Sequence, residues 1–236
     1  MPTPEWVRSN KWAPAAAGGG SAGYSVECPA TGELGHGKPQ HIPQEVLASL
    51  LADELGLFVP PTRLGSCENS TIAASKLWGE KSIDVPTFAR DHPTEYASAP
   101  FVAALRHASG LLPFQTWLNN GDHKDQHVMV RPGPQPDVYE IASIDFAGAF
   151  SWDPSGGPVI PVGPPVLLAE SNRDPVRMSA TIAKIEGMSD GRIREIVQGI
   201  PDAVLPPGEK ERYVTGLIAR RDKVRAALVA AGWLSA

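Results

Sequence analysis

The sequence of 236 residues contains only two cysteines, Cys28 and Cys67. Two cysteines are too few for the disulfide scaffold of a small secreted domain, so we expect both to be reduced, buried thiols. Long apolar runs are also lacking. The N-terminus, MPTPEWVRSNKW, has no apolar signal core, and no run reaches the roughly 18 apolar residues of a membrane span. These absences predict a cytoplasmic protein that has no membrane partner.

Positive charge is scarce as well, with 21 Lys and Arg against 26 Asp and Glu and a formal net charge of −5. Diffuse binding to nucleic acid depends on clustered Lys and Arg, so we expect no nucleic-acid partner. Proline and glycine, at 24 and 23 residues, exceed their usual share without reaching the level of disordered chains. A chain of this length and composition forms one large domain or two small lobes with long ordered loops.

A glycine-rich segment, AAAGGGSAG, spans residues 15–23. Its glycines allow the backbone conformations that are needed where amides approach a phosphate. The segment lacks the spacing of a Walker loop or of a dinucleotide fingerprint, and a flexible linker or plain turn has the same composition. Because short strands are expected at Tyr24–Cys28 and Leu34–Lys38, one interpretation is a glycine-rich turn that covers phosphates.

The clearest helix is predicted for Pro43–Leu55, where proline suits the first turn, leucines and valine form one apolar face, and Gly56 ends the helix. Glu45 lies near its start, where the helix dipole alone would favour an acid. Helical patterns dominate from about residue 100 onward and end with a helix expected at Glu209–Ala231. We therefore expect an α+β fold with a small strand-containing N-lobe, residues 1–90, and a larger helical C-lobe, residues 91–236.

Acidic, imidazole and amide side chains are concentrated in the segment Trp117–Phe150. Within it, Asp122 and Asp145 each stand beside an apolar run, Val128–Val130 and Val138–Ile144, and the linker RPGPQPD between the runs indicates a hairpin. Carboxylates at the two ends of a hairpin could face one small volume and share a cation or a substrate. The alternative is two turn aspartates that accept local backbone N–H groups.

Phosphoryl transfer requires few protein groups. An acid must orient and deprotonate the attacking hydroxyl, metal ligands and a cation must hold the nucleotide phosphates, and a loop must cover them. Asp122, His127 and Asp145 follow one another in the order base, metal ligand, metal ligand of kinase catalytic loops. The sequence thus contains a candidate for each part.

The motifs NNGDHKDQHVMV and SIDFAGAF resemble the N-x-D-x-x-x-x-N and I-D-x-x-x-A-F signatures of the HipA-like kinases and, more distantly, those of phosphatidylinositol kinases. Lys38 and Glu45, with the segment EVLASLLADELGLFVP, resemble the family's strand lysine and the following helix. The C-terminal run from IVQGIPDAVLPP to LIARRDKVRAAL resembles its helical tail. The resemblance implies a bilobal protein-kinase-like fold and an ATP- and Mg²⁺-dependent transfer of phosphate to a hydroxyl, on a protein Ser/Thr or on a small-molecule acceptor.

The resemblance also implies roles for individual residues. Asp122 would be the catalytic base and Asp145 the principal Mg²⁺ ligand. Lys38 would bind the nucleotide phosphates, with Glu45 as its partner. From the glycine-rich composition of their segment, we expect Gly18, Gly19, Gly20 and Ser21 to cover the phosphates.

His127 stands where the family has asparagine as its second metal ligand. Imidazole is less suited than an amide or carboxylate oxygen to Mg²⁺, so the substitution favours Mn²⁺ as the alternative ion. Other candidates for this ligand are Asn120, Asp125 and Gln126.

Three other functions fit the same residues. A pseudokinase would bind a nucleotide or a partner without turnover. A metallohydrolase would use His123 and His127, four residues apart on one helix face, to bind zinc together with Asp122 or Asp145. A structural protein would have no site at all.

Overall fold

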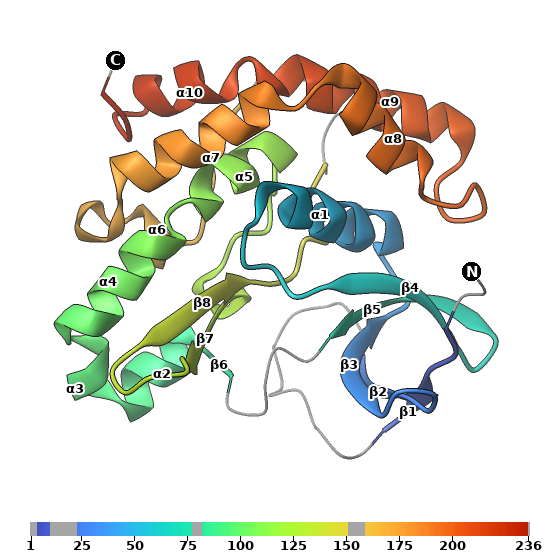
Figure 1. Ribbon diagram of the computed structural model, residues 1–236, viewed down its shortest axis with the longest axis horizontal. Coiled ribbons are helices and arrows are strands. Elements are labelled where there is room, and N and C mark those ends of the chain that lie inside the picture. Colours follow the sequence, from blue (N-terminus) through green and yellow to red (C-terminus); the bar gives the residue numbers. More distant parts are fainter. Residues whose placement is uncertain (1–3, 10–22, 77–81, 151–158, 236) are drawn as a thin grey trace.

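The computed structural model describes residues 4–9, 23–76, 82–150 and 159–235. It consists of a curled antiparallel sheet and a larger helical body that contains a second sheet, with helix α1 between them (Figure 1). The strand order of the curled sheet is β1-β2-β3-β5-β4. Its strands are β1 (Val7–Arg8), β2 (Tyr24–Cys28), β3 (Glu33–Lys38), β4 (Thr62–Cys67) and β5 (Ser70–Lys76).

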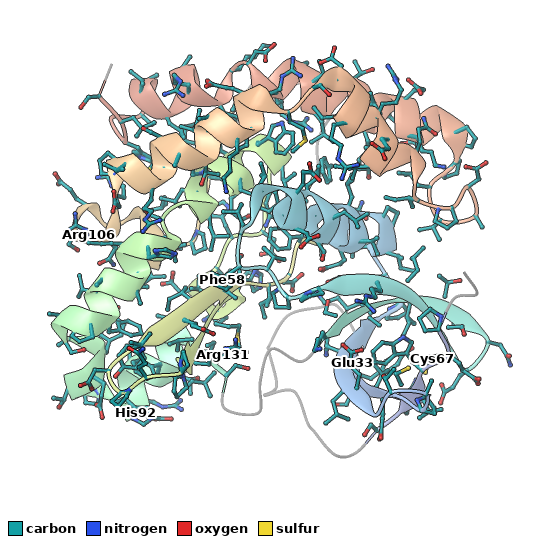
Figure 2. The ribbon with its side chains drawn as sticks, in the orientation of Figure 1. Glu33, Phe58, Cys67, His92, Arg106 and Arg131 are labelled. Atoms are coloured by element: carbon teal, nitrogen blue, oxygen red, sulfur yellow. The ribbon has the colours of Figure 1, made fainter. Side chains whose placement is uncertain are left out.

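The curled sheet encloses a small apolar core around the indole of Trp6. Glycines in the strands make room for this ring, since a Cβ atom at Gly65 would collide with it and one at Gly35 would lie 3.4 Å from it. Cys28 and Cys67 are free thiols buried in the same core, as predicted, and Figure 2 shows Cys67 inside the curl. The glycine-rich composition of these strands therefore has a packing cause.

Helix α1 (Ile42–Leu55) begins one residue before the predicted start and is followed by Gly56, whose left-handed φ of 65° brings the N–H of Leu57 to the carbonyl of Ala52 at 2.9 Å. The helix contacts β4 and β5 on one side and α7 (Pro175–Gly187) and α8 (Asp190–Gln198) on the other. Its buried leucines, Leu47, Leu51 and Leu55, belong to the large apolar core of the helical body. The buried face of α1 thus belongs to the core of that body, while the helix also contacts the curled sheet.

The second sheet contains the predicted hairpin. Strands β7 (Val128–Pro132) and β8 (Tyr139–Ser143) pair with Val128 opposite Ser143, and β6 (Ile83–Asp84) pairs with β7. The hairpin ends therefore bring the segments before β7 and after β8 together, as the sequence indicated.

The remaining helices lie beside the second sheet or, from residue 175 onward, across the top of the molecule and above α1 (Figure 1). In chain order they are α2 (Val85–Asp91), α3 (Pro93–Tyr96), α4 (Ala99–Ala108), α5 (Leu111–Leu118), η1 (Asp125–His127), α6 (Pro165–Leu168), η2 (Glu170–Asn172), α7 (Pro175–Gly187), α8 (Asp190–Gln198), α9 (Pro207–Arg221) and α10 (Val224–Ala230). None of the helices in the described ranges has the length and apolarity of a membrane span.

The prediction of one continuous helix at Glu209–Ala231 is wrong. The chain turns at Asp222 and Lys223, and two helices result. Because of this turn, α10 buries Val224 and Leu228 and contacts α5. A straight continuation of α9 would not bring these residues to α5. The lobe boundary at residue 90 stays a prediction.

Candidate active site

Lys38, near the C-terminal end of β3, lies between two carboxylates. Its Nζ atom is 2.6 Å from Oε1 of Glu45 on α1 and 2.9 Å from Oδ1 of Asp145, which follows β8. Lys38 and Glu45 are buried, and the side chain of Asp145 is 19% exposed. Three elements that are distant in sequence therefore bring one cation into contact with two anions. The family resemblance had implied the pair of Lys38 and Glu45 but not the contact of Lys38 with Asp145.

The charges of these three groups are coupled. Burial lowers the pKa of Lys38, but the charges of Glu45 and Asp145 outweigh burial and raise it above its ordinary value. Burial raises the pKa of Asp145, yet the charge and hydrogen bond of Lys38 and the charge of His127 bring it down to about 2. Burial, together with the charge of Asp145, raises the pKa of Glu45, although the charge and hydrogen bond of Lys38 oppose this shift. The cluster is thus poor in positive charge and suited to attract a cation.

Backbone geometry fixes the position of Asp145. The residue has a left-handed φ of 60°, and the N–H of Ile144 before it bonds the carbonyl of His127 at 2.9 Å. Phe146 after it is buried against Phe114, with ring centroids 5.8 Å apart. The aspartate is therefore anchored on both sides by the core.

The loop that carries Asp122 is held by amides. Helix α5 ends at Asn119, and the next side chain, Asn120, donates from Nδ2 to Gln115 at 2.7 Å. Its Oδ1 atom accepts the N–H of Asp122 at 3.4 Å. The carbonyl of Gly148 accepts the N–H of Gly121 at 3.0 Å. Asn120 thus positions the loop, and both the nitrogen and the oxygen of its amide are used in these hydrogen bonds.

Three side chains meet at the hairpin ends. Each of the three residues Asp122, His127 and Asp145 offers one ligand atom, and these three atoms lie within 4.8 Å of one another. His127 places Nδ1 3.0 Å from the carbonyl oxygen of Asp122 and Nε2 3.6 Å from Oδ2 of Asp145. Two carboxylates and one imidazole suit a divalent cation, so this donor set fits the metal that a kinase fold implies.

The remaining candidates are placed differently. Asp125 accepts the N–H of Val166 through Oδ1 at 2.7 Å, and Gln126 is exposed. His123 lies outside the three-residue cluster, with Nδ1 3.1 Å from the carbonyl oxygen of Asn120. Its segment is not helical, so the proposed zinc-binding helix face is wrong. The glycine-rich residues Gly18, Gly19, Gly20 and Ser21 lie outside the described part of the chain.

Two residues of this region received no role from the sequence. Lys124 places Nζ 2.8 Å from Oδ1 of Asp122, and its spacing of two residues from that aspartate was an available signal. His36 stands two residues before Lys38 on β3, so both side chains project from the same face of the sheet. Burial and the charge of Lys38 lower the pKa of His36 to about 4, while Asp145 opposes them. Strand alternation could have identified His36.

Comparisons with known proteins give structural matches only. No family model matches the chain, and no curated protein matches its sequence. Among solved structures, the chain is similar to the Helicobacter pylori proinflammatory kinase CtkA, with a TM-score of 0.66, 17% identity and 100% coverage of both chains. This likeness confirms the expected bilobal, kinase-like α+β fold.

Two further structures resemble the chain more weakly. HipA from a Shewanella oneidensis toxin–antitoxin complex matches over 83% of this chain and 60% of that one, with 12% identity and a TM-score of 0.46. WaaP, solved in complex with acyl carrier protein, matches over 98% and 84%, with 13% identity and a TM-score of 0.42.

Proposed function

We propose that this chain is a HipA-like kinase that transfers the γ-phosphoryl group of ATP to a hydroxyl. The observation that carries the proposal is the meeting of Lys38 with Asp145, and of Asp145 with Asp122 and His127, in a chain that has a kinase-like fold. Phosphoryl transfer depends mainly on positioning and on charge, and these four side chains provide a base, cation ligands and a phosphate-binding cation.

Asp122 is the proposed base. Its side chain is 38% exposed, so an acceptor hydroxyl can reach it. The acceptor oxygen forms a bond to the γ-phosphorus while the bond from that phosphorus to the ADP oxygen breaks, and the hydroxyl proton passes to the Asp122 carboxylate. Lys124, in contact with Asp122, is placed to stabilise the negative charge of the transferred group.

Asp145 and Lys38 are the proposed nucleotide-binding groups, and Asp145 with His127 would hold Mg²⁺ or Mn²⁺. A bound divalent cation would neutralise charge on the phosphate oxygens. Glu45 orients Lys38 through the 2.6 Å contact. The proposed phosphate cover by Gly18, Gly19, Gly20 and Ser21 rests on the sequence alone.

The acceptor is proposed to be a protein Ser or Thr, on the strength of the family resemblance, with a small-molecule hydroxyl as the alternative. A pseudokinase is the second candidate function. The observation in its favour is that His127, whose imidazole is a poorer ligand for Mg²⁺ than an amide oxygen, lies at the metal-ligand position. The two candidates differ in turnover and agree in nucleotide binding.

The deciding experiment combines calorimetry with ATP and a phosphate-transfer assay with labelled ATP, in Mg²⁺ and in Mn²⁺. Asp122→Asn should lower turnover by about 10²- to 10⁴-fold while nucleotide affinity stays within about twofold, because it removes the proton acceptor and leaves Lys38 and Asp145 in place. The matched control is Asp137→Asn in the β7–β8 turn, where the left-handed φ of 58° is one that asparagine also adopts.

Each outcome separates the candidates. Transfer in wild type and Asp137→Asn but not in Asp122→Asn supports the kinase. Nucleotide binding without transfer in any protein supports the pseudokinase. Equal transfer by wild type and Asp122→Asn would overturn the assigned base, and no heat with millimolar ATP and either cation would overturn both functions.

A further inference from the structure

The imidazole of His127 is held in one orientation. Its Nδ1 atom lies 3.0 Å from the carbonyl oxygen of Asp122, and its side chain is only 13% exposed. A carbonyl oxygen only accepts hydrogen bonds, so Nδ1 carries the hydrogen in this contact. In the neutral ring, Nε2 then carries the lone pair, which is the form in which histidine binds metals.

The lone pair of Nε2 faces an anion. Oδ2 of Asp145 lies 3.6 Å from Nε2, which is too long for a hydrogen bond. When the imidazole is neutral, these two electron-rich atoms repel each other, and a cation between them would offset that repulsion. Ligand atoms that each lie about 2.0–2.2 Å from one ion are roughly 3–4 Å apart, so this pair has the spacing of two ligands of the same ion.

The carboxylate of Asp145 is divided between two partners. Its Oδ1 atom contacts Nζ of Lys38 at 2.9 Å, which leaves Oδ2 on the side of His127. Asp122, which has a carboxylate atom within 4.8 Å of the other two ligand atoms, is the most exposed of the three and contacts Lys124. His127 and Asp145 are therefore preassembled as ligands, and the proposed base lies beside them.

We propose that His127 and Asp145, beside the proposed base Asp122, form a site that binds Mn²⁺, or another transition ion of similar chemistry, before the nucleotide and without it. Mg²⁺ requires a nearly ideal oxygen octahedron and usually depends on substrate phosphates to complete it. An imidazole ligand shifts affinity toward Mn²⁺ and the later divalent ions. His127 is then the residue that determines which cation the site uses. This inference deepens the proposed function, because the ion occupies the same site.

The test is a calorimetric titration of nucleotide-free protein with MnCl₂ and with MgCl₂. Wild type should bind one Mn²⁺ at least tenfold more tightly than Mg²⁺. His127→Asn should weaken Mn²⁺ binding about tenfold or more and bring the two affinities together. His123→Asn is the matched control, because this histidine lies in the same loop, contacts a backbone carbonyl through Nδ1 in the same way and lies outside the cluster.

Pulsed electron paramagnetic resonance of the Mn²⁺ complex gives a readout that does not depend on activity. Wild type and His123→Asn should show coupling of the metal to one imidazole nitrogen, and His127→Asn should show none. The wild-type spectrum decides the question even if His127→Asn fails to fold. A Mn²⁺ complex without nitrogen coupling, or wild type that binds neither ion, would overturn the proposal.

These outcomes are separable from failure of the kinase function. Nitrogen-coupled Mn²⁺ in a protein that transfers no phosphate would support this inference and contradict phosphoryl transfer. Transfer supported equally by Mg²⁺ in wild type and in His127→Asn would support the kinase and contradict the role of His127.

Discussion

The Nζ atom of Lys38 lies 2.9 Å from Oδ1 of Asp145, and this contact joins the curled sheet to the helical body. The two parts have separate apolar cores, one around Trp6 and one formed by the helices together with the buried face of α1. Glu45 lies on α1, which contacts both the sheet and the helices, while Lys38 belongs to the sheet and Asp145 to the helical body.

Removal of Lys38 should lower the stability of the folded protein, because it leaves the buried carboxylate of Glu45 and the largely buried carboxylate of Asp145 without a cation. We expect Lys38→Met to lower the free energy of unfolding by about 3 kcal/mol, and Glu45→Gln added to it to restore at least about 1 kcal/mol. The measurement is urea unfolding at pH 7. Lys76→Met is the matched control. Its pair with Glu33 at 3.2 Å is largely exposed, so its loss should cost less than about 1 kcal/mol. Greater destabilisation by the double change than by Lys38→Met alone would contradict this account.

Helix α1 should unfold with the helical body and not with the sheet. Lys184 on α7 donates to the carbonyl of Leu55 at 2.6 Å, and Arg192 on α8 contacts Glu54 at 2.6 Å. Native-state hydrogen exchange should therefore give the α1 amides opening free energies close to those of α5, and lower values for β2 and β3. Exchange of α1 together with β2 and β3 would show that the helix moves with the sheet.

Local patterns were sufficient to predict the elements that depend on neighbouring residues. The apolar face and Gly56 located α1, and the two apolar runs with their Pro/Gly linker located the hairpin. The resemblance to kinase motifs selected Lys38, Glu45, Asp122 and Asp145, and the structure brings them to one region. The roles of these residues remain proposals.

Relationships between distant segments could not be predicted in the same way. Nothing local indicates that Trp6 fills the curled sheet, so the reason for the glycines opposite it could not be predicted. The turn at Asp222 was missed because the helical pattern continues through it, while the packing of α10 on α5 determines the break. The orientation of His127 depends on a carbonyl contact that only the folded loop creates.

The buried imidazole of His36 should make stability depend on pH. Burial and the adjacent charge of Lys38 hold its pKa at about 4 in the folded protein, against about 6.5 in the unfolded chain, and Asp145 opposes the shift only in part. Between these values the unfolded state binds more protons, so stability is complete above about pH 6.5 and is lost as the pH falls toward 4.

We expect this group to contribute a loss of about 1–2 kcal/mol between pH 7.5 and pH 5. The measurement is urea unfolding at several pH values for wild type and for His36→Gln. The variant should lose less stability over this range, whatever its stability at pH 7.5. An identical pH dependence in the two proteins would contradict the role given to His36.

Gly148 should be required for the position of Asp122. A Cβ atom at Gly148 would lie 2.5 Å from the backbone nitrogen of Asp122 and 2.8 Å from Oδ1 of Asn120. Gly148→Ala must therefore push the Asp122 loop away, while Lys38, Glu45 and Asp145 are held by contacts that do not involve this glycine.

The proposed base would be displaced from its position, and a shift of about 1 Å can cost on the order of 10² in rate. We expect Gly148→Ala to lower phosphate transfer by about that factor with ATP affinity within about threefold of wild type, measured with labelled ATP and by calorimetry. Gly208→Ala is the control, because a Cβ atom there meets no atom within 4 Å. Full activity in Gly148→Ala would mean that the loop adapts without cost, and Asp122 would then not need the position described for it.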